Sequence, residues 1–90
     1  MKSYVKDPDA SLDYPFDWSA YLTPINDTIQ SVSWIAEPGL TLGATSHTTT
    51  SATAFGSGGV LDTAPMLTCR ITTVGGRTDD WSIILKIVNR

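Results

Sequence analysis

The sequence predicts an all-β fold made of two packed sheets. Apolar residues recur at every second position in several short runs, which is the period of a strand with one buried face. Turn-forming residues separate these runs about every 8–12 residues, and Thr and Ser are abundant while no segment shows helical periodicity. This pattern is typical of a small immunoglobulin-like β-sandwich of about six to seven antiparallel strands. A small barrel is the competing architecture, and tryptophans at inward positions of different strands favour the sandwich.

The stretch SLDYPFDW, residues 11–18, carries the clearest alternation. Its apolar side chains fall on even positions and are expected to point into the core, whereas the acids between them face solvent. Pro15 lies on the polar side, and a proline has no N–H to donate to a neighbouring strand. We therefore expect this strand at the edge of a sheet, or with a bulge at Pro15.

The chain after residue 18 is expected to form one helical turn, SAYL, and then a series of strands. In the EPG stretch, Pro38 followed by Gly39 has the chemistry of a type II turn, and the paired glycines of VGGR predict a hairpin. GSGG, residues 56–59, is expected to end a strand that is weak because Ala52 and Ala54 are small. The expected strands are residues 28–36, 40–43, 48–55, 66–73 and 80–88, with residues 44–47 as a connection.

The inward positions of these strands predict the hydrophobic core. Trp81 begins an inward series on the last strand, and Cys69 occupies an inward position on the strand before it. The predicted core anchors are Leu12, Tyr14, Phe16, Trp18, Trp34, Cys69, Ile71, Trp81, Ile83 and Leu85.

Length and charge limit the classes of protein to which the chain can belong. The 90 residues suit one domain, expected over residues 11–90 after an N-terminal arm of residues 1–10. A net charge of −3 with few, dispersed basic residues argues against nucleic acid as a partner. No run approaches the roughly 18 apolar residues of a membrane span, and no signal peptide is visible. The single cysteine excludes a disulfide within the chain, so we expect synthesis in a reducing cytoplasm.

Residues able to carry out catalysis or hold a metal are scarce. His47 lies in a polar stretch without a nucleophile motif beside it, and Cys69 is expected to be a small buried apolar residue. Zinc needs several Cys or His ligands in close spacing, which the sequence lacks. We therefore expect no enzyme, no metal and no cofactor, and by elimination a binding or assembly protein.

The candidate contacts with a partner lie in three places: the KDPD turn with the acidic face after it, the hairpin end RTDD, and the outer face of the last strand. Arg77 is expected to pair across the hairpin with Asp79 or Asp80, and the outward apolar residues Ile84 and Val88 suggest contact with another chain. The candidate partner-binding residues are Lys6, Asp7, Pro8, Asp9, Asp13, Asp17, Arg77, Asp79, Asp80, Ile84 and Val88.

Three stretches carry a resemblance to a known family. VKDPDASLDYPFDWSAYL, SWIAEPGLTL and CRITTVGGRTDDWSIILKI occur in an order that resembles the fibre-tail adaptor proteins of tailed bacteriophages. In the middle strand Ala52 and Ala54 stand where the resemblance leads us to expect larger apolar residues. The resemblance implies a structural protein of the virion, made in the host cytoplasm and placed between the tail or connector and a fibre or neighbouring ring. It also implies virion proteins as partners. The physical reasoning agrees with this role, because repeated copies in a symmetric assembly would multiply weak contacts, and residues 1–9 are the segment expected to cross to a neighbour.

Two other functions remain open on the sequence. A capsid-decoration or head-completion protein would use the same kind of small sandwich. A carbohydrate-binding module would need exposed aromatic residues, for which Phe55, Tyr21 and Tyr4 are the candidates.

Overall fold

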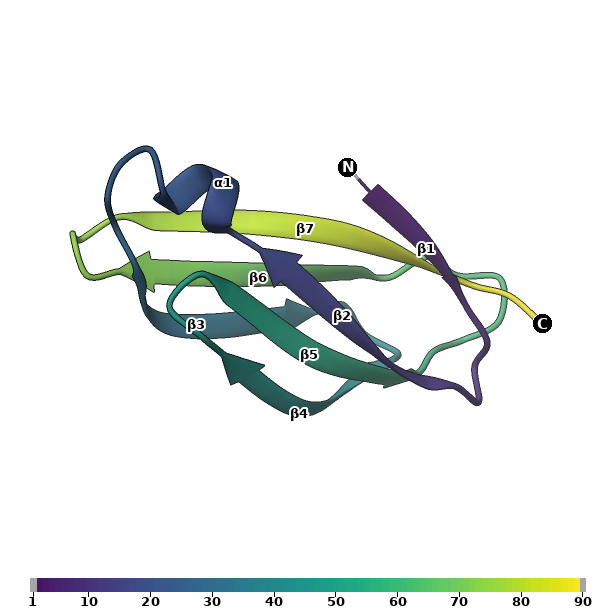
Figure 1. Ribbon diagram of the computed structural model, residues 1–90. Helices are drawn as coiled ribbons and strands as arrows, with labels where there is room; N and C mark the ends of the chain where they lie inside the picture. Colours follow the sequence, from purple (N-terminus) through teal and green to yellow (C-terminus); the bar gives the residue numbers. More distant parts are fainter. Residues whose placement is uncertain (1, 90) are drawn as a thin grey trace.

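The chain forms two β-sheets that pack face to face (Figure 1). The computed structural model describes residues 2–89. One sheet has the strand order β1-β7-β6-β3 and the other the order β2-β5-β4. The predicted β-sandwich is confirmed, and the barrel alternative is wrong because a barrel is one sheet closed on itself. In chain order the elements are β1 (Lys2–Lys6), β2 (Ser11–Asp17), α1 (Ser19–Leu22), β3 (Ile29–Ala36), β4 (Leu40–His47), β5 (Ser51–Gly58), β6 (Met66–Thr73) and β7 (Thr78–Ile87).

The first strand, β1, corrects the expectation that the chain begins with an irregular arm. Residues Lys2–Lys6 pair with β7, with Lys2 opposite Ile83 and Lys6 opposite Ile87. This pair is parallel, whereas the other strand pairs are antiparallel, so the prediction of a wholly antiparallel sandwich is wrong at one position. The sequence KSYVK is too short to display the period of a strand. Its partner residues on β7 lie about 80 positions away in the chain. Parallel strands need a long connection between them, so the local sequence does not reveal this pairing.

Aromatic rings fill the space between the two sheets. Phe16 on β2 is 1% exposed and meets the rings of Trp34 and Trp81 edge to face, with 5.5 Å between centroids in each pair. Trp18 meets Trp81 in the same geometry at 5.4 Å, an arrangement that aromatic pairs favour. The buried core side chains are Tyr14, Phe16, Trp18, Leu22, Ile29, Leu40, Ala52, Leu67, Cys69, Ile71, Ile83, Leu85 and Ile87.

The small residues of β5 have a structural reason. Ala52 and Ala54 point inward beside Phe16 and Tyr14, their register partners on β2. A Cβ added at Gly56 would lie 3.2 Å from the Tyr14 ring. The aromatic residues of β2 therefore occupy the volume that larger residues on β5 would need.

Two predicted core anchors are exposed. Leu12 is 39% exposed although it alternates with Tyr14, because it lies near the start of β2 opposite Gly56, which has no side chain to cover it. Trp81 is 37% exposed although its ring contacts those of Phe16 and Trp18. Trp34 is half-buried on the edge strand β3.

Several local predictions hold and several boundaries change, since the strand expected at residues 48–55 begins at Ser51 and the last strand spans Thr78–Ile87. β2 is the outer strand of its sheet, as Pro15 predicts, SAYL forms the helical turn α1, and Gly39 has φ +98° as a type II turn requires. β4 runs on to His47 through a bulge between Leu42 and Thr45, so residues 44–47 are strand and not connection. β5 likewise continues through the glycines to Gly58, because backbone pairing with both neighbours does not require large side chains.

Candidate interaction surfaces

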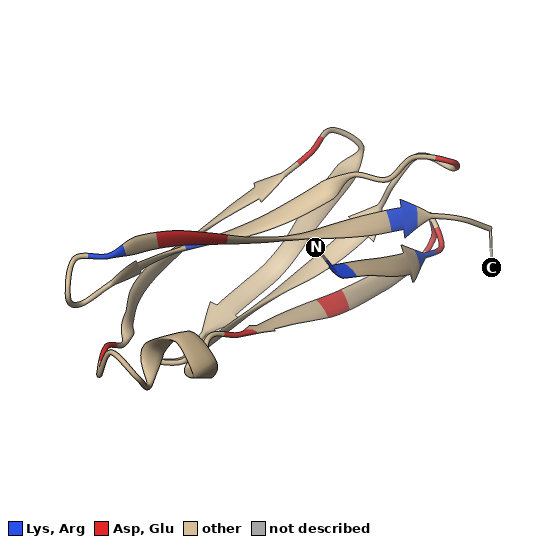
Figure 2. Cartoon of the chain, turned by 90° about the horizontal axis from the view of Figure 1, so that it is seen from above, with Lys and Arg blue, Asp and Glu red and all other residues tan. Residues whose placement is uncertain are grey.

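Charge is distributed unevenly over the sandwich. Strands β3, β4 and β5 carry no Lys, Arg, Asp or Glu, whereas β1 carries lysines, β2 carries aspartates and β7 carries both signs (Figure 2). We call the surface formed by β3, β4 and β5 the uncharged side. β3 and β4 are the outer strands of their sheets, so this side includes two free strand edges. Proteins commonly protect free edges with charges or proline, and here each of these two edge strands carries only one bulge.

The opposite edge strand, β2, carries the acidic face predicted from the sequence. Asp13 and Asp17 are exposed on either side of Pro15. Asp17 also has a local role, because its Oδ1 accepts a hydrogen bond of 2.9 Å from the backbone N–H of Ser19 at the start of α1. Hydrogen bonds with Ser19 hold the pKa of the Asp17 carboxyl below its usual value. The two acids are therefore accessible, and one of them helps to begin the helical turn.

The KDPD stretch forms the expected turn between β1 and β2. The backbone N–H of Asp9 donates to Asp7 Oδ1 over 2.8 Å, and the N–H of Ala10 donates to the Asp7 carbonyl over 3.0 Å. Asp9 is exposed, whereas Asp7 and Pro8 are partly buried. The turn fixes the direction in which the chain leaves β1.

Lys6 is not available to a partner, which corrects its assignment as a contact residue. Its side chain is 0% exposed, and its Nζ donates to the carbonyl oxygens of Gly58 at 2.6 Å and Asp7 at 2.8 Å. Burial lowers the pKa of this ammonium, and the nearby carboxylates of Asp7 and Asp9 oppose that shift. Lys6 thus ties the end of β5 in one sheet to β1 in the other.

The hairpin between β6 and β7 contains the RTDD motif, with pairings that differ from the expectation. Arg77 Nη1 lies 2.8 Å from Asp27 Oδ2, and not across the hairpin on Asp79 or Asp80. Asp80 instead receives two hydrogen bonds, of 2.8 Å and 3.0 Å, from the guanidinium of Arg70 on β6. That guanidinium lowers the pKa of the Asp80 carboxyl. The reason is strand geometry, because Arg70 and Asp80 are directly opposite in the β6–β7 register.

Asp27 is a structural residue of this surface that the sequence reasoning missed. Its carboxylate is 5% exposed and accepts hydrogen bonds from the N–H groups of Thr28 and Gly75 as well as from Arg77. A side-chain hydrogen bond from Thr73 is the largest cause that lowers its pKa to about 2. The only sequence signal was an Asp in a loop, a residue type that often bonds to nearby backbone N–H groups, and nothing local pointed to the distant hairpin.

Asp27 should make the stability of the protein depend on acid pH. A carboxyl with a folded-state pKa near 2 and an ordinary value of 3.8 stabilises the fold fully above about pH 4 and loses that contribution as the pH falls towards 2. Asp27→Asn is therefore expected to lower the urea midpoint at pH 6, and the gap from the unchanged protein is expected to close by pH 2. Equilibrium urea unfolding at a series of pH values measures this. The matched control, Asp13→Asn, removes an exposed acid and should leave the midpoint at pH 6 nearly unchanged; a gap for Asp27→Asn that persists at pH 2 would contradict the assignment.

The outer face of the β1-β7-β6-β3 sheet holds the two apolar contact candidates. Ile84 is partly buried opposite Met66 on β6 and Ser3 on β1. Val88 follows β7, is partly buried, and donates its backbone N–H to the carbonyl of Lys6 over 2.9 Å. Both therefore contribute to packing of the fold, and neither stands out as an exposed apolar residue.

The two residues considered for catalysis, His47 and Cys69, lie on strands of different sheets. His47 is exposed at the end of β4, and Cys69 is buried on β6, where burial raises the pKa of its thiol to about 11. A thiol held protonated in this way is a poor nucleophile. Among residues 2–89, no group of three or more His, Cys, Asp or Glu side chains is placed to hold a metal ion.

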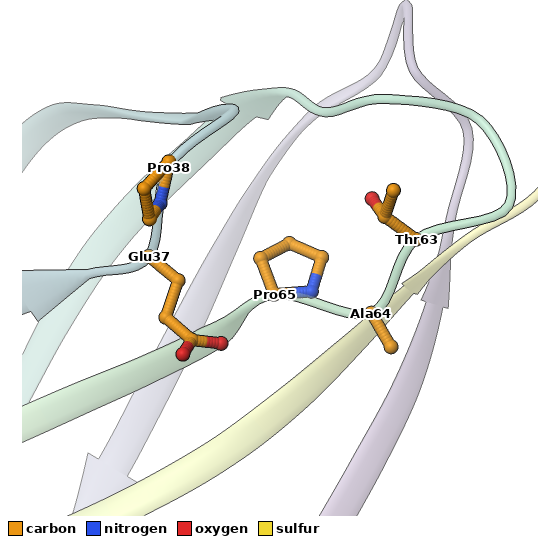
Figure 3. Close-up of a pocket in the computed structure, with 5 residues that line it drawn as sticks. All are labelled: Glu37, Pro38, Thr63, Ala64 and Pro65. Carbon is orange, nitrogen blue, oxygen red and sulfur yellow. The ribbon is translucent and has the colours of Figure 1, made fainter.

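One shallow pocket lies between the β3–β4 turn and the loop before β6 (Figure 3). It has a volume of about 290 Å³ and is lined by Glu37, Pro38, Thr63, Ala64 and Pro65. Glu37 Oε1 accepts a hydrogen bond of 2.7 Å from the N–H of Met66, so the only charged group in the pocket already serves to hold the two loops together. The pocket lies where two loops of the fold meet, and its one charged side chain is already engaged in a hydrogen bond within the protein.

The three aromatic candidates for glycan contact differ in exposure. Tyr4 packs against Tyr14 at 5.5 Å and Tyr21 against Trp18 at 5.7 Å, and both are partly buried. Phe55 is 41% exposed on the outer face of β5. A single exposed ring is a small platform for a sugar.

Comparison with known proteins agrees with an assembly role. Residues 6–86 match the model of a family described as podophage GP4 fiber-tail adaptor protein gp77. No curated protein matches the chain. Across the described part of the chain, residues 2–89, none of the helices has the length and apolar character that crossing a membrane requires. The family is one of structural proteins of the phage tail, and since the match spans nearly the whole chain, this protein belongs to the podophage GP4 fiber-tail adaptor family.

Proposed function

We propose that this protein is a non-enzymatic adaptor that joins the tail or connector of a podophage to a fibre or neighbouring ring. The observation that carries the proposal is the family match over residues 6–86. Several copies would be arranged with symmetry around the tail, so that weak contacts add up through multivalency.

The uncharged side supplies the first docking surface of the proposed adaptor. An unpaired strand edge offers backbone N–H and C=O groups that a partner strand can join, which is a common mode of assembly. The edges of β3 and β4 carry no charge to repel such a strand, whereas β2 on the opposite edge carries Asp13, Pro15 and Asp17. We therefore assign the β3 and β4 edges to contact with another virion protein.

We also infer that the sandwich is immunoglobulin-like in its connectivity. The order β2-β5-β4 facing β7-β6-β3 has the arrangement of strands B, E, D and G, F, C in an immunoglobulin domain. The first strand pairs with the last one and not with β2. This arrangement supports the sequence-based fold class and leaves loops at both ends for contacts.

A charged residue placed on the uncharged side tests the docking surface. Ser46→Lys puts an ammonium on the outer edge strand β4, where Ser46 is exposed. We expect about tenfold less of the variant in purified particles, equivalent to about 1.4 kcal/mol of lost binding. Quantitative mass spectrometry of particles assembled with each variant measures the incorporated amount, and a particle map locates the protein at the tail.

The matched control is Ser11→Lys, which makes the same change at an exposed position of β2. It should leave incorporation near the level of the unchanged protein. Normal incorporation of Ser46→Lys would remove the β3 and β4 edges from the interface. A particle map that places the protein on the head, and not at the tail, would overturn the adaptor role and favour the capsid-decoration alternative.

A further inference from the structure

The β6–β7 hairpin extends beyond the end of the β2-β5-β4 sheet (Figure 1). Val74 at its tip is 68% exposed, the largest exposed fraction among the large apolar side chains of residues 2–89. The turn of residues 23–28 lies beside the hairpin, because the N–H of Val74 donates to the Thr28 carbonyl over 3.0 Å. Ile25 in that turn is 36% exposed, so this end of the sandwich shows two apolar side chains to its surroundings.

The tip is held rigidly although it is exposed. Asp27 bonds to the N–H of Gly75 at 3.0 Å and to the guanidinium of Arg77 at 2.8 Å. Thr73 accepts the N–H of Arg77 on its hydroxyl and the N–H of Gly76 on its carbonyl, each over 3.0 Å. A Cβ at Gly75 would lie 2.9 Å from Asp27 Oδ2, so the glycine lets the carboxylate approach the turn closely. A preordered loop loses less conformational entropy on binding than a mobile one.

The acidic side chains near the hairpin tip outnumber the basic ones by one. Arg70 is paired with Asp80, and Arg77 with Asp27. Asp79 is exposed, and its Oδ1 accepts a hydrogen bond of 2.8 Å from the neighbouring backbone N–H of Asp80. No salt bridge to Asp79 occurs within residues 2–89. The hairpin therefore presents one uncompensated negative charge close to its apolar tip.

From these features we infer that the β6–β7 hairpin is a second docking element, which inserts Val74 into an apolar pocket of a protein partner with a Lys or Arg at the pocket rim facing Asp79. An exposed apolar residue gains free energy when it enters such a pocket, and a rim cation speeds and orients the encounter. The inference rests on the proposed adaptor function, since an adaptor needs separate contacts for the two bodies that it joins. The hairpin tip lies at one end of the sandwich beside the start of β3, and the edges of β3 and β4 run from that end along the side of the molecule.

Particles assembled with Val74→Asp test the inference. We expect at least tenfold less of this variant in purified particles, while its urea midpoint stays that of the unchanged protein because Val74 is exposed. Val60→Asp is the matched control, since Val60 is 58% exposed in the loop between β5 and β6 at the other end of the sandwich. Its incorporation should be normal. If Val74→Asp lowers the urea midpoint, Val74→Ser replaces it as the test variant with the same expected direction.

The charge of the partner is tested separately with Asp79→Lys. Reversal of this charge is expected to reduce incorporation more than Asp79→Asn does, because a rim cation would be repelled and not merely left without a counter-ion. Normal incorporation of the Val74 variants overturns the hairpin inference, and equal effects of the two Asp79 variants overturn the basic rim. Both results leave the adaptor role intact as long as the unchanged protein is found at the tail, whereas its absence from the tail would refute the adaptor role itself.

Discussion

Phe16→Ala is expected to lower the free energy of unfolding by about 3–5 kcal/mol, the usual loss when a buried phenylalanine is truncated. Phe16 is 1% exposed and meets Trp34 and Trp81 edge to face, so the change removes contacts with β3 and β7 of the opposite sheet. A small domain has a total stability of only about 5–15 kcal/mol. Equilibrium urea unfolding followed by tryptophan fluorescence measures the loss.

A matched control for Phe16→Ala exists on the same sheet. Phe55 is the same residue type on the neighbouring strand β5, but it faces outward and is 41% exposed. Phe55→Ala should change the free energy of unfolding by no more than about 0.5 kcal/mol. Similar losses for the two variants would show that the inward and outward faces of the sheet are wrongly assigned.

Lys6→Ala is expected to lower the free energy of unfolding by about 2–3 kcal/mol, because hydrogen bonds from a charged donor are worth about 1.5–3 kcal/mol. The variant leaves the carbonyl of Gly58 without its donor at 2.6 Å and empties the space of a side chain that is 0% exposed. Removal of the desolvated charge offsets part of this loss. Chemical unfolding at neutral pH measures the difference.

Lys86→Ala is the control that removes a lysine charge without removing a buried side chain. Lys86 is exposed on β7, the strand that pairs with β1. Its removal should change stability by less than about 0.5 kcal/mol. Lys6→Met adds a second comparison, since it keeps most of the apolar stem and loses only the ammonium. Equal stability of Lys6→Ala and the unchanged protein would mean that the link from Lys6 to Gly58 contributes nothing to the fold.

The structure assigns a physical role to two stretches that define the resemblance to the adaptor family. The lysine of KDPD connects the two sheets through Gly58, and the aspartate after it forms the turn into β2. In RITTVGGRTDD, Arg70 and Arg77 each bind a different carboxylate and keep the hairpin in place. These residues thus hold the shape of the proposed contact surfaces, and Val74, which we expect to meet a partner, lies between Arg70 and Arg77.

The candidate contact residues show where sequence reasoning succeeded and failed. Asp13 and Asp17 are exposed, as strict alternation along β2 required. Lys6 belongs to the KDPD turn that the sequence offers as a contact, and the structure buries it because its acceptor, the carbonyl of Gly58, lies 52 positions away. Asp27 was overlooked for the same reason, since Arg77 is 50 positions away from it.

The sequence by itself determined the all-β class and the turns at Gly39 and in the β6–β7 hairpin, and it limited β2 to a sheet edge or a bulge at Pro15. Each of these depends on neighbouring residues, through a period of two, the missing N–H of Pro15 or the conformational freedom of glycine. Only the tertiary structure decided that β1 pairs with β7, that Lys6 is buried and that Arg77 binds Asp27. The reason is that these contacts join segments distant in the chain, whose meeting depends on how the two sheets stack and not on any local pattern.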